Sequence, residues 1–250
     1  MEKPRLEINR FDSLTQCCTA IGSFLQVFIQ SSIDRQGYCT IALPGGKTPT
    51  TLLQSLSRPP FSTTVRWSKV FFFFGDERIV PLDHPDSNFG MAQRNLLSPL
   101  SITGDHVFSM PVATRPYATA ARQYQETMAK VFGALTSREH PYAEAEYPAF
   151  DLILLGMGAD GHTASLFPGH QALHQKEWVV VVEAEQAMMP PLPRLTMTLP
   201  LINNADTALF LVSGAEKIRL AESFLPNPSS SCLPAALVRP RQRLLWYLAD

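Results

Sequence analysis

The chain has 250 residues, of which 45% are apolar and 17% are charged, and its formal net charge is −1. This composition supports a sizeable folded core and excludes a disordered polyelectrolyte. The near-neutral charge, without a basic run, predicts no nucleic-acid partner and no attraction to an acidic membrane surface. No apolar stretch approaches the roughly 20 residues that a membrane span requires, so a soluble protein is expected.

The first residues and the cysteines favour a cytoplasmic protein. Residues 1–12 carry charges where a signal peptide would need its apolar segment. The cysteines show no C-x-x-C pair and no disulfide framework, which favours reduced thiols; they are Cys17, Cys18, Cys39 and Cys232. Among the histidines, His170 and His174 have a spacing of four residues but no acidic residue of the zinc-protease kind between them. The sequence therefore predicts no metal site.

Apolar runs of strand length alternate with helical patterns along the chain. Apolar residues recur every three or four positions in 12–33 and in 117–135, which predicts helices there. The predicted strands are Tyr38–Leu43, Val70–Phe74, Asp151–Leu155, Trp178–Val182, Ala208–Val212 and Leu244–Leu248. These runs are nearly continuous, as is typical of parallel strands covered on both faces. The pattern predicts one α/β domain over 1–250, with a parallel sheet between helices and with loops at 136–149 and 226–235.

The first predicted strand is followed by a glycine-containing loop, Pro44–Pro49. Thr48 before Pro49 predicts a helix start, with the threonine hydroxyl as N-cap and proline in the first turn. Gly45 and Gly46 leave backbone N–H groups open above that helix, and such a nest suits a phosphate. An ordinary strand-to-helix turn is the alternative interpretation of these residues and of Lys47 between them.

Three charged residues, Asp76, Glu77 and Arg78, follow the second predicted strand. Their charge predicts that they are either solvated or line a site, and not that they belong to the core. Arg78 could bind a phosphate through two hydrogen bonds, and Asp76 could accept one from a sugar hydroxyl. Downstream, residues 86–88 are predicted to cap a helix that contains 91–97.

The segment 151–169, DLILLGMGADGHTASLFPG, admits two interpretations. Its three glycines match G-x-G-x-x-G after a strand, with Glu183 near the place of a ribose-binding acid, which is typical of a dinucleotide site. Asp160 would however oppose a pyrophosphate, and a proline-glycine pair interrupts the helix that should follow. In the second interpretation the glycines turn the chain to present His162 at the start of a short helix, whose positive end keeps the imidazole neutral. Asp160 would then orient the ring or a water.

Two further basic residues are candidate anion ligands. Lys217 follows the strand Ala208–Val212 at the same kind of position as the loops above, and Arg194 precedes it in the chain. Each of them considered alone could equally be a surface charge. A serine triad is not expected, because the G-x-S-x-G pattern is absent.

Three segments together resemble the 6-phosphogluconolactonase family: PGGKTPTTLL, GDERIVPLDHPDSNFGMAQRNLL and GMGADGHTASLFPG. The resemblance runs in the same order from about residue 38 to the C-terminus. It implies a modified Rossmann-like, three-layer α/β fold with a mostly parallel sheet and helices on both faces, and no nucleotide cofactor. It also implies hydrolysis of 6-phosphoglucono-δ-lactone in the oxidative pentose phosphate pathway, by a cytoplasmic monomer or homodimer.

By this resemblance His162 would be the general base that activates water, with Asp160 and Asp76 in supporting roles. Gly45, Gly46, Thr48 and Arg78 would frame the substrate, and Arg194 and Lys217 would hold its phosphate. Lys47 replaces a serine or threonine that is usual in the family, so a phosphate contact and a solvated side chain are both open for it. Related deaminases carry a glutamate five residues after the histidine, where this chain has Phe167. The alternatives are another sugar-phosphate isomerase or deaminase and a non-catalytic sugar-phosphate sensor.

Overall fold

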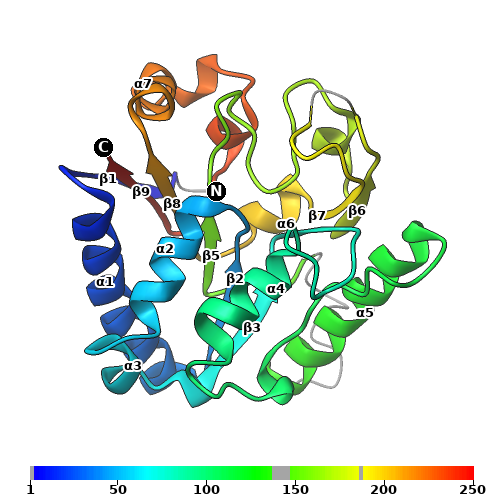
Figure 1. Cartoon of the computed structure of the whole chain (residues 1–250). Helices are drawn as coiled ribbons and strands as arrows, with labels where there is room; N and C mark the ends of the chain where they lie inside the picture. Colours follow the sequence, from blue (N-terminus) through cyan, green and yellow to red (C-terminus); the bar gives the residue numbers. More distant parts are fainter. Residues whose placement is uncertain (1–2, 137–146, 186–187) are drawn as a thin grey trace.

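A parallel six-stranded sheet lies at the centre of the computed structural model, which describes residues 3–136, 147–185 and 188–250 (Figure 1). The strand order is β1-β9-β8-β5-β2-β3, and every neighbouring pair is parallel. The strands are β1 (Arg5–Phe11), β2 (Cys39–Leu43), β3 (Val70–Phe74), β5 (Leu152–Leu155), β8 (Thr207–Ser213) and β9 (Arg243–Ala249). Residues of β2 and β5 are buried without exception, which explains why their sequences are apolar apart from Thr40, whose hydroxyl is hydrogen-bonded to Asp151.

Helices cover both faces of this sheet, as the sequence predicted. The α-helices are α1 (Leu14–Gln36), α2 (Lys47–Leu56), α3 (Phe61–Thr64), α4 (Asn88–Ala92), α5 (Tyr117–Thr136), α6 (Leu199–Asn203) and α7 (Ala215–Phe224). On β9, Trp246 packs against Phe224 of α7, whereas the next residue, Tyr247, packs against Phe24 of α1. Because successive strand residues point to opposite faces, α1 and α7 lie on opposite sides of the sheet.

A second sheet was not predicted. The strands β4 (Asp76–Arg78), β7 (Arg194–Met197) and β6 (Val179–Val182) form it in the order β4-β7-β6, and both pairings are antiparallel. The prediction that 178–182 is a strand is confirmed, but the prediction of a parallel one is wrong. A run of four valines is equally suited to any strand with two covered faces, so the run could not distinguish the two sheets.

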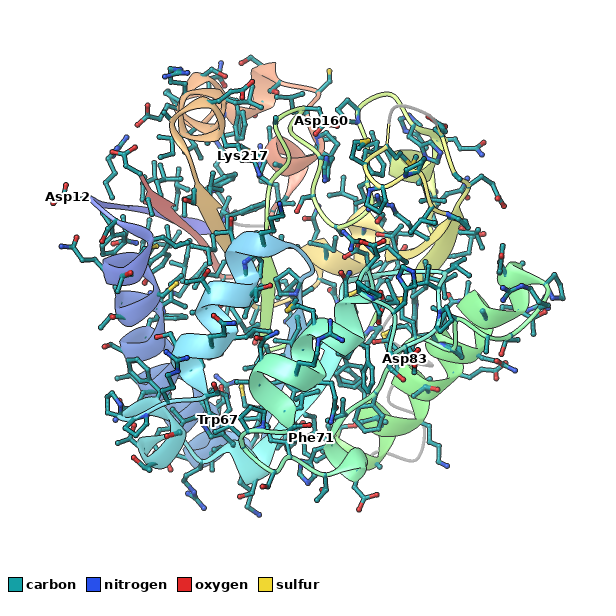
Figure 2. The ribbon with its side chains drawn as sticks, viewed as in Figure 1. Asp12, Trp67, Phe71, Asp83, Asp160 and Lys217 are labelled. Carbon is teal, nitrogen blue, oxygen red and sulfur yellow. The ribbon has the colours of Figure 1, made fainter. Side chains whose placement is uncertain are left out.

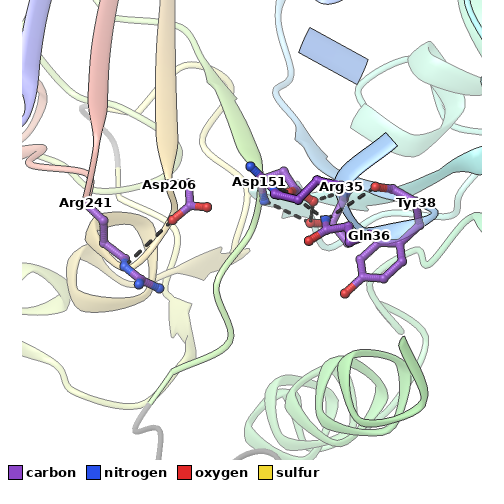
Figure 3. Close-up of polar contacts among 7 residues, drawn as sticks. Arg35, Gln36, Tyr38, Asp151, Asp206 and Arg241 are labelled. Atoms are coloured by element: carbon purple, nitrogen blue, oxygen red, sulfur yellow. Dashed lines mark hydrogen bonds and ion pairs between the residues drawn. The ribbon is translucent and has the colours of Figure 1, made fainter. Parts of the chain in front are cut away.

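One buried carboxylate, that of Asp151, joins several elements at the end of the large sheet where its strands begin (Figure 3). Asp151, at the start of β5, accepts hydrogen bonds from the backbone N–H and the hydroxyl of Thr40 on β2, each at 2.8 Å. It also accepts from Arg35 and Gln36 at the end of α1, at 2.9 and 2.8 Å. Burial raises the pKa of Asp151, and these hydrogen bonds oppose that shift. The contacts join β5, β2 and α1 at the end of the sheet opposite the loops described below.

Short helices complete the described chain. The 3₁₀ helices are Trp67–Lys69, Gly104–His106, Gln171–His174, Pro228–Ser230 and Pro234–Leu237, and Gln93–Leu97 is a π-helical turn that continues α4. The predicted loop at 136–149 falls largely outside the described residues, while 226–235 contains the 3₁₀ turn Pro228–Ser230 and the start of Pro234–Leu237. No helix in the described part of the chain has both the length and the apolar character needed to cross a bilayer.

Candidate active site

A cleft of about 160 Å³ opens where the strands of the large sheet end. Loops that follow β2, β5 and β8, three adjacent strands, supply most of its wall, and β4, β7 and the segment before β7 supply the rest. Asp160 and Lys217 lie at this end of the molecule, whereas Trp67 and Phe71, at the beginning of β3, lie at the opposite end (Figure 2). The cleft therefore occupies the position at which open parallel sheets bind ligands.

The structure brings the predicted site residues together. Those that line the cleft are Gly45, Gly46, Lys47, Thr48, Asp76, Arg78, His162, Arg194 and Lys217. Asp160 does not line it but contacts the His162 ring. Residues from five separate segments of the chain thus converge on one concave surface.

His162 and Asp160 form a close pair in the loop after β5. The carboxylate Oδ1 of Asp160 lies 2.6 Å from Nδ1 of the ring and accepts from the backbone N–H of His162 at 3.1 Å. Since a carboxylate can only accept, Nδ1 carries the proton and the neutral ring keeps its free lone pair on Nε2. Of the two roles predicted for Asp160, the structure shows contact with the ring.

Gly158 makes room for this pair. A Cβ atom at this position would lie 2.2 Å from two atoms of the His162 ring and 2.5 Å from the Asp160 carboxylate. The glycine is therefore needed for close approach of side chains. Gly161, by contrast, has φ +80°, a conformation that favours glycine for its backbone.

The short helix predicted after His162 is absent. Thr163 and Leu166 instead form an isolated bridge, joined by hydrogen bonds in both directions, and Ala164 between them has φ +48°. The prediction that a helix dipole acts on His162 is therefore wrong, and its ring is oriented by the Asp160 side chain. Thr163 donates its hydroxyl proton to the Gly156 carbonyl at 2.9 Å, which fixes this turn to the end of β5.

The amino-terminal ends of α2 and α7 both meet the cleft. Their N-cap residues are Gly46 and Gly214, and neither helix has a side-chain cap. The predicted N-cap, Thr48, lies one residue inside α2, because Gly46 with φ +105° makes the turn that a threonine could not make. The open N–H groups of two helix ends, beside Lys47 and Lys217, give this part of the cleft a positive potential. Lys47 is exposed at the rim, and Lys217 is half-buried.

Arg78 on β4 and Arg194 on β7 lie directly opposite each other on neighbouring strands of the small sheet. Arg194 is only 2% exposed, so the prediction that it could be a surface charge is wrong. Burial lowers the pKa of Arg194, and the Arg78 charge adds to this shift while Asp76 opposes it. In the described residues, neither Nε atom has a hydrogen-bond partner, although both are buried. Two incompletely bonded cations side by side are costly unless an anion joins them.

Asp76 is buried in the cleft wall and is held by two side chains. Its Oδ1 accepts from the Asn88 amide at 3.1 Å, and its Oδ2 accepts from the Ser165 hydroxyl at 2.6 Å. Ser165 lies in the motif GMGADGHTASLFPG but was not predicted as a site residue. Asn88 was predicted only as a helix-capping residue.

The prediction that the charged residues after β3 do not belong to the core is wrong for Glu77, which is fully buried. Its carboxylate accepts from the Ser87 hydroxyl at 3.0 Å and from the backbone N–H groups of Arg78, Asn88 and Phe89 at 2.7 to 2.8 Å. Burial raises its pKa, and these hydrogen bonds oppose the shift. Ser87 is the N-cap of α4, as predicted for this segment. Glu77 thus anchors the start of α4 and has no place in the cleft.

Two further residues were missed. The Phe167 ring lies 4.7 Å from the His162 ring and 5.4 Å from the Arg194 guanidinium, centre to centre. Met189 lines the cleft although it is 84% exposed, and no pattern in the sequence marks it. Across the part of the chain that is described, no three His, Cys, Asp or Glu side chains are grouped as metal ligands would be.

Comparisons with known proteins agree with this geometry. A family model described as glucosamine-6-phosphate isomerases/6-phosphogluconolactonase matches residues 12–246. The 6-phosphogluconolactonase of Synechocystis sp. is 39% identical over 221 residues, which cover 88% of this chain and 85% of that protein. A probable 6-phosphogluconolactonase 1 of Arabidopsis thaliana is 36% identical over 252 residues, which cover 98% of this chain and 92% of that protein.

Solved structures extend the similarity. The 6-phosphogluconolactonase from Trypanosoma brucei superposes with a TM-score of 0.80 at 30% identity, covering 100% of this chain and 97% of that one. The enzyme from Trypanosoma cruzi superposes with a TM-score of 0.83 at 29% identity, covering 99% and 94%. The fold, the cleft and these matches together show that the chain belongs to the glucosamine-6-phosphate isomerase/6-phosphogluconolactonase family.

Proposed function

We propose that this protein hydrolyses 6-phosphoglucono-δ-lactone to 6-phosphogluconate, the reaction of the oxidative pentose phosphate pathway, with His162 as the general base. The observation that carries the proposal is the His162–Asp160 pair at 2.6 Å, placed in a cleft whose other wall holds paired arginines. The similarity to two relatives named 6-phosphogluconolactonase and probable 6-phosphogluconolactonase 1 extends over most of their length and supports the choice of substrate.

The proposed reaction needs one base and one water. Nε2 of His162 takes a proton from water as the oxygen attacks the lactone carbonyl carbon. The tetrahedral intermediate then breaks the bond between that carbon and the ring oxygen, and the imidazolium returns the proton to the departing alkoxide. Asp160 accepts a hydrogen bond from the Nδ1–H group throughout and stabilises the charged ring. Because a δ-lactone is an activated ester, this chemistry requires no metal or organic cofactor.

The phosphate is proposed to bind to the cationic wall of the cleft. Arg194 and Lys217 hold it, while Arg78 and the open N–H groups above Gly45 and Gly46 frame the sugar. An anion satisfies the guanidinium groups that the folded protein leaves incompletely bonded. The binding energy of this remote group fixes the orientation of the carbonyl carbon toward His162.

The contact between Phe167 and His162 favours hydrolysis over the ring opening of an amino sugar. The ring of Phe167 lies directly against the imidazole, at the position where a carboxylate could relay a proton to it. A phenyl ring can neither give nor take a proton. It leaves Asp160 as the acidic partner of His162 among the described contacts.

The test is lactone hydrolysis by wild type, His162→Ala and the control His174→Ala, which changes a histidine outside the cleft. Lactone is formed from glucose 6-phosphate by oxidation in place, and its decay is measured above the spontaneous rate. We expect His162→Ala to lower kcat by 10²- to 10⁴-fold, roughly the range for loss of a general base, and to retain 6-phosphogluconate binding. His174→Ala should behave as wild type.

Each outcome has a distinct meaning. A folded wild-type protein that does not accelerate the reaction contradicts the proposed activity and leaves sugar-phosphate sensing as the function to test, by ligand binding. Acceleration that survives in His162→Ala retains the activity but contradicts the role of the base.

A further inference from the structure

We propose that Ser165 is a positioning residue that keeps the Asp76 carboxylate from pairing with Arg194, so that the guanidinium charge stays available to the substrate phosphate. The inference rests on the proposed function, since it concerns how the same cleft binds its anion. It adds a residue that does not line the cleft and lies on the turn carrying His162.

The hydroxyl of Ser165 stands between the two charged groups. It donates to Asp76 Oδ2 at 2.6 Å and accepts from Arg194 Nη1 at 3.5 Å. The first bond is short and charge-assisted, whereas the second is at the limit of hydrogen bonding. Ser165 is itself fully buried, so water does not compete for either contact.

Asp76 and Arg194 remain unpaired in spite of their proximity. Asp76 is the group whose charge most strongly favours the protonated form of Arg194. Yet none of the ion pairs in the described residues joins these two side chains. In a buried site a direct ion pair would form unless each charge had another partner. Asn88 and Ser165 are those partners for the two carboxylate oxygens of Asp76, and the Pro190 carbonyl accepts from Nη2 of Arg194 at 3.0 Å.

Loss of the hydroxyl therefore has a defined consequence. Oδ2 of Asp76 loses its donor, and Arg194, which is already joined to the same hydroxyl, is a cation that can replace it. The resulting ion pair neutralises the arginine toward an incoming phosphate. A second hydrogen bond holds the same turn without touching this pair, because the Thr196 hydroxyl accepts from the backbone N–H of Ser165 at 3.1 Å.

The experiment measures binding of inorganic phosphate by calorimetry to wild type, Ser165→Ala, Thr196→Val and the double variant Ser165→Ala/Asp76→Asn. Thr196→Val is the matched control, because it removes the other tether of the turn. We expect Ser165→Ala to weaken phosphate binding about tenfold, the value of one charge-assisted hydrogen bond. Thr196→Val should stay within about twofold of wild type, and the double variant should recover most of the loss, because an amide cannot form the competing ion pair.

Lactone hydrolysis by wild type is measured in parallel to separate the two proposals. If the wild-type protein hydrolyses the lactone and Ser165→Ala binds phosphate as tightly as wild type, the inference is overturned and the proposed function stands. Equal losses in Ser165→Ala and Thr196→Val, or a loss that Asp76→Asn does not restore, also overturn it, because the serine would then act only through the fold. A wild-type protein that neither binds phosphate nor hydrolyses lactone overturns both proposals.

Discussion

The substitution Gly158→Ala tests how precisely the His162 ring must be placed. The added Cβ would lie 2.2 Å from the ring, whereas ordinary contacts begin near 3.4 Å, so the ring has to retreat by about 1.2 Å. A displacement of about 1 Å at a reacting group costs roughly a hundredfold in rate, and we expect a fall in kcat of that size. The Asp160 carboxylate, 2.5 Å from the new atom, must move as well.

The same substitution should leave the fold intact. Gly158 is not among the glycines with positive φ, so alanine adopts its backbone without strain. The His162 side chain is 31% exposed, which gives the ring room to move toward solvent. We therefore expect little change in melting temperature and unchanged binding of 6-phosphogluconate by calorimetry, together with the loss of kcat.

Gly75→Ala is the matched control, because Gly75 lies at the same edge of the sheet, does not line the cleft, and has room for a Cβ 3.8 Å from its nearest neighbour. It should retain wild-type kcat. A Gly158→Ala enzyme with kcat within about threefold of wild type would contradict the reasoning. The His162 ring would then tolerate a displacement of about 1 Å without the roughly hundredfold loss of rate expected above.

Three other predictions concern charge and thiols. Asp160→Asn should lower kcat about a hundredfold with KM little changed in lactone assays, because an amide no longer fixes the Nδ1 proton of His162; an unchanged kcat would remove Asp160 from the mechanism. A thiol reagent at pH 8 should label Cys232 alone in the native protein and four cysteines after unfolding, since Cys232 is exposed while burial raises the pKa of the other three thiols, to about 12 for Cys17 and about 11 for Cys18; the third is Cys39. The raised pKa of Glu77 means that the native state holds this proton at pH values where the unfolded state, near 4.5, has lost it. The stability of wild type relative to Glu77→Gln should therefore fall as pH rises through the native pKa, so that urea unfolding gives a larger difference at pH 4 than at pH 7, and the opposite order would contradict this sign.

Most strands of the parallel sheet could be predicted from the sequence, because a strand that is buried on both faces consists mainly of apolar residues. The strands at Val70–Phe74 and Leu152–Leu155 lie within one residue of the prediction, since a strand covered on both faces must be apolar throughout. The strand Arg5–Phe11 was missed for the opposite reason. It lies at the sheet edge, and its charged residues form ion pairs with neighbours that are distant in sequence, such as Arg10 with Glu222.

The candidate site was predictable where residue type alone indicates chemistry. His162, Asp160 and Arg78 carry ionisable groups beside glycines or after a strand, and the structure gathers them at one end of the sheet. The tertiary partners could not be predicted. The burial of Glu77 depends on three hydrogen-bond donors from residues 87–89, about ten residues further along the chain. The turn at Ala164 depends on a backbone bridge with hydrogen bonds in both directions.

The cleft combines contributions from two sheets that are joined at Gly75, whose backbone N–H donates to Leu43 of β2 and whose carbonyl accepts from the backbone N–H of Met197 of β7. The large parallel sheet carries His162, whereas the small antiparallel sheet carries Arg78 and Arg194. Lys217 follows β8 of the large sheet, so a phosphate held by both Arg194 and Lys217, as proposed, would bridge the two sheets. The distance from Arg194 to Lys217 and to the His162 loop therefore depends on how the two sheets are joined, and not on either sheet alone.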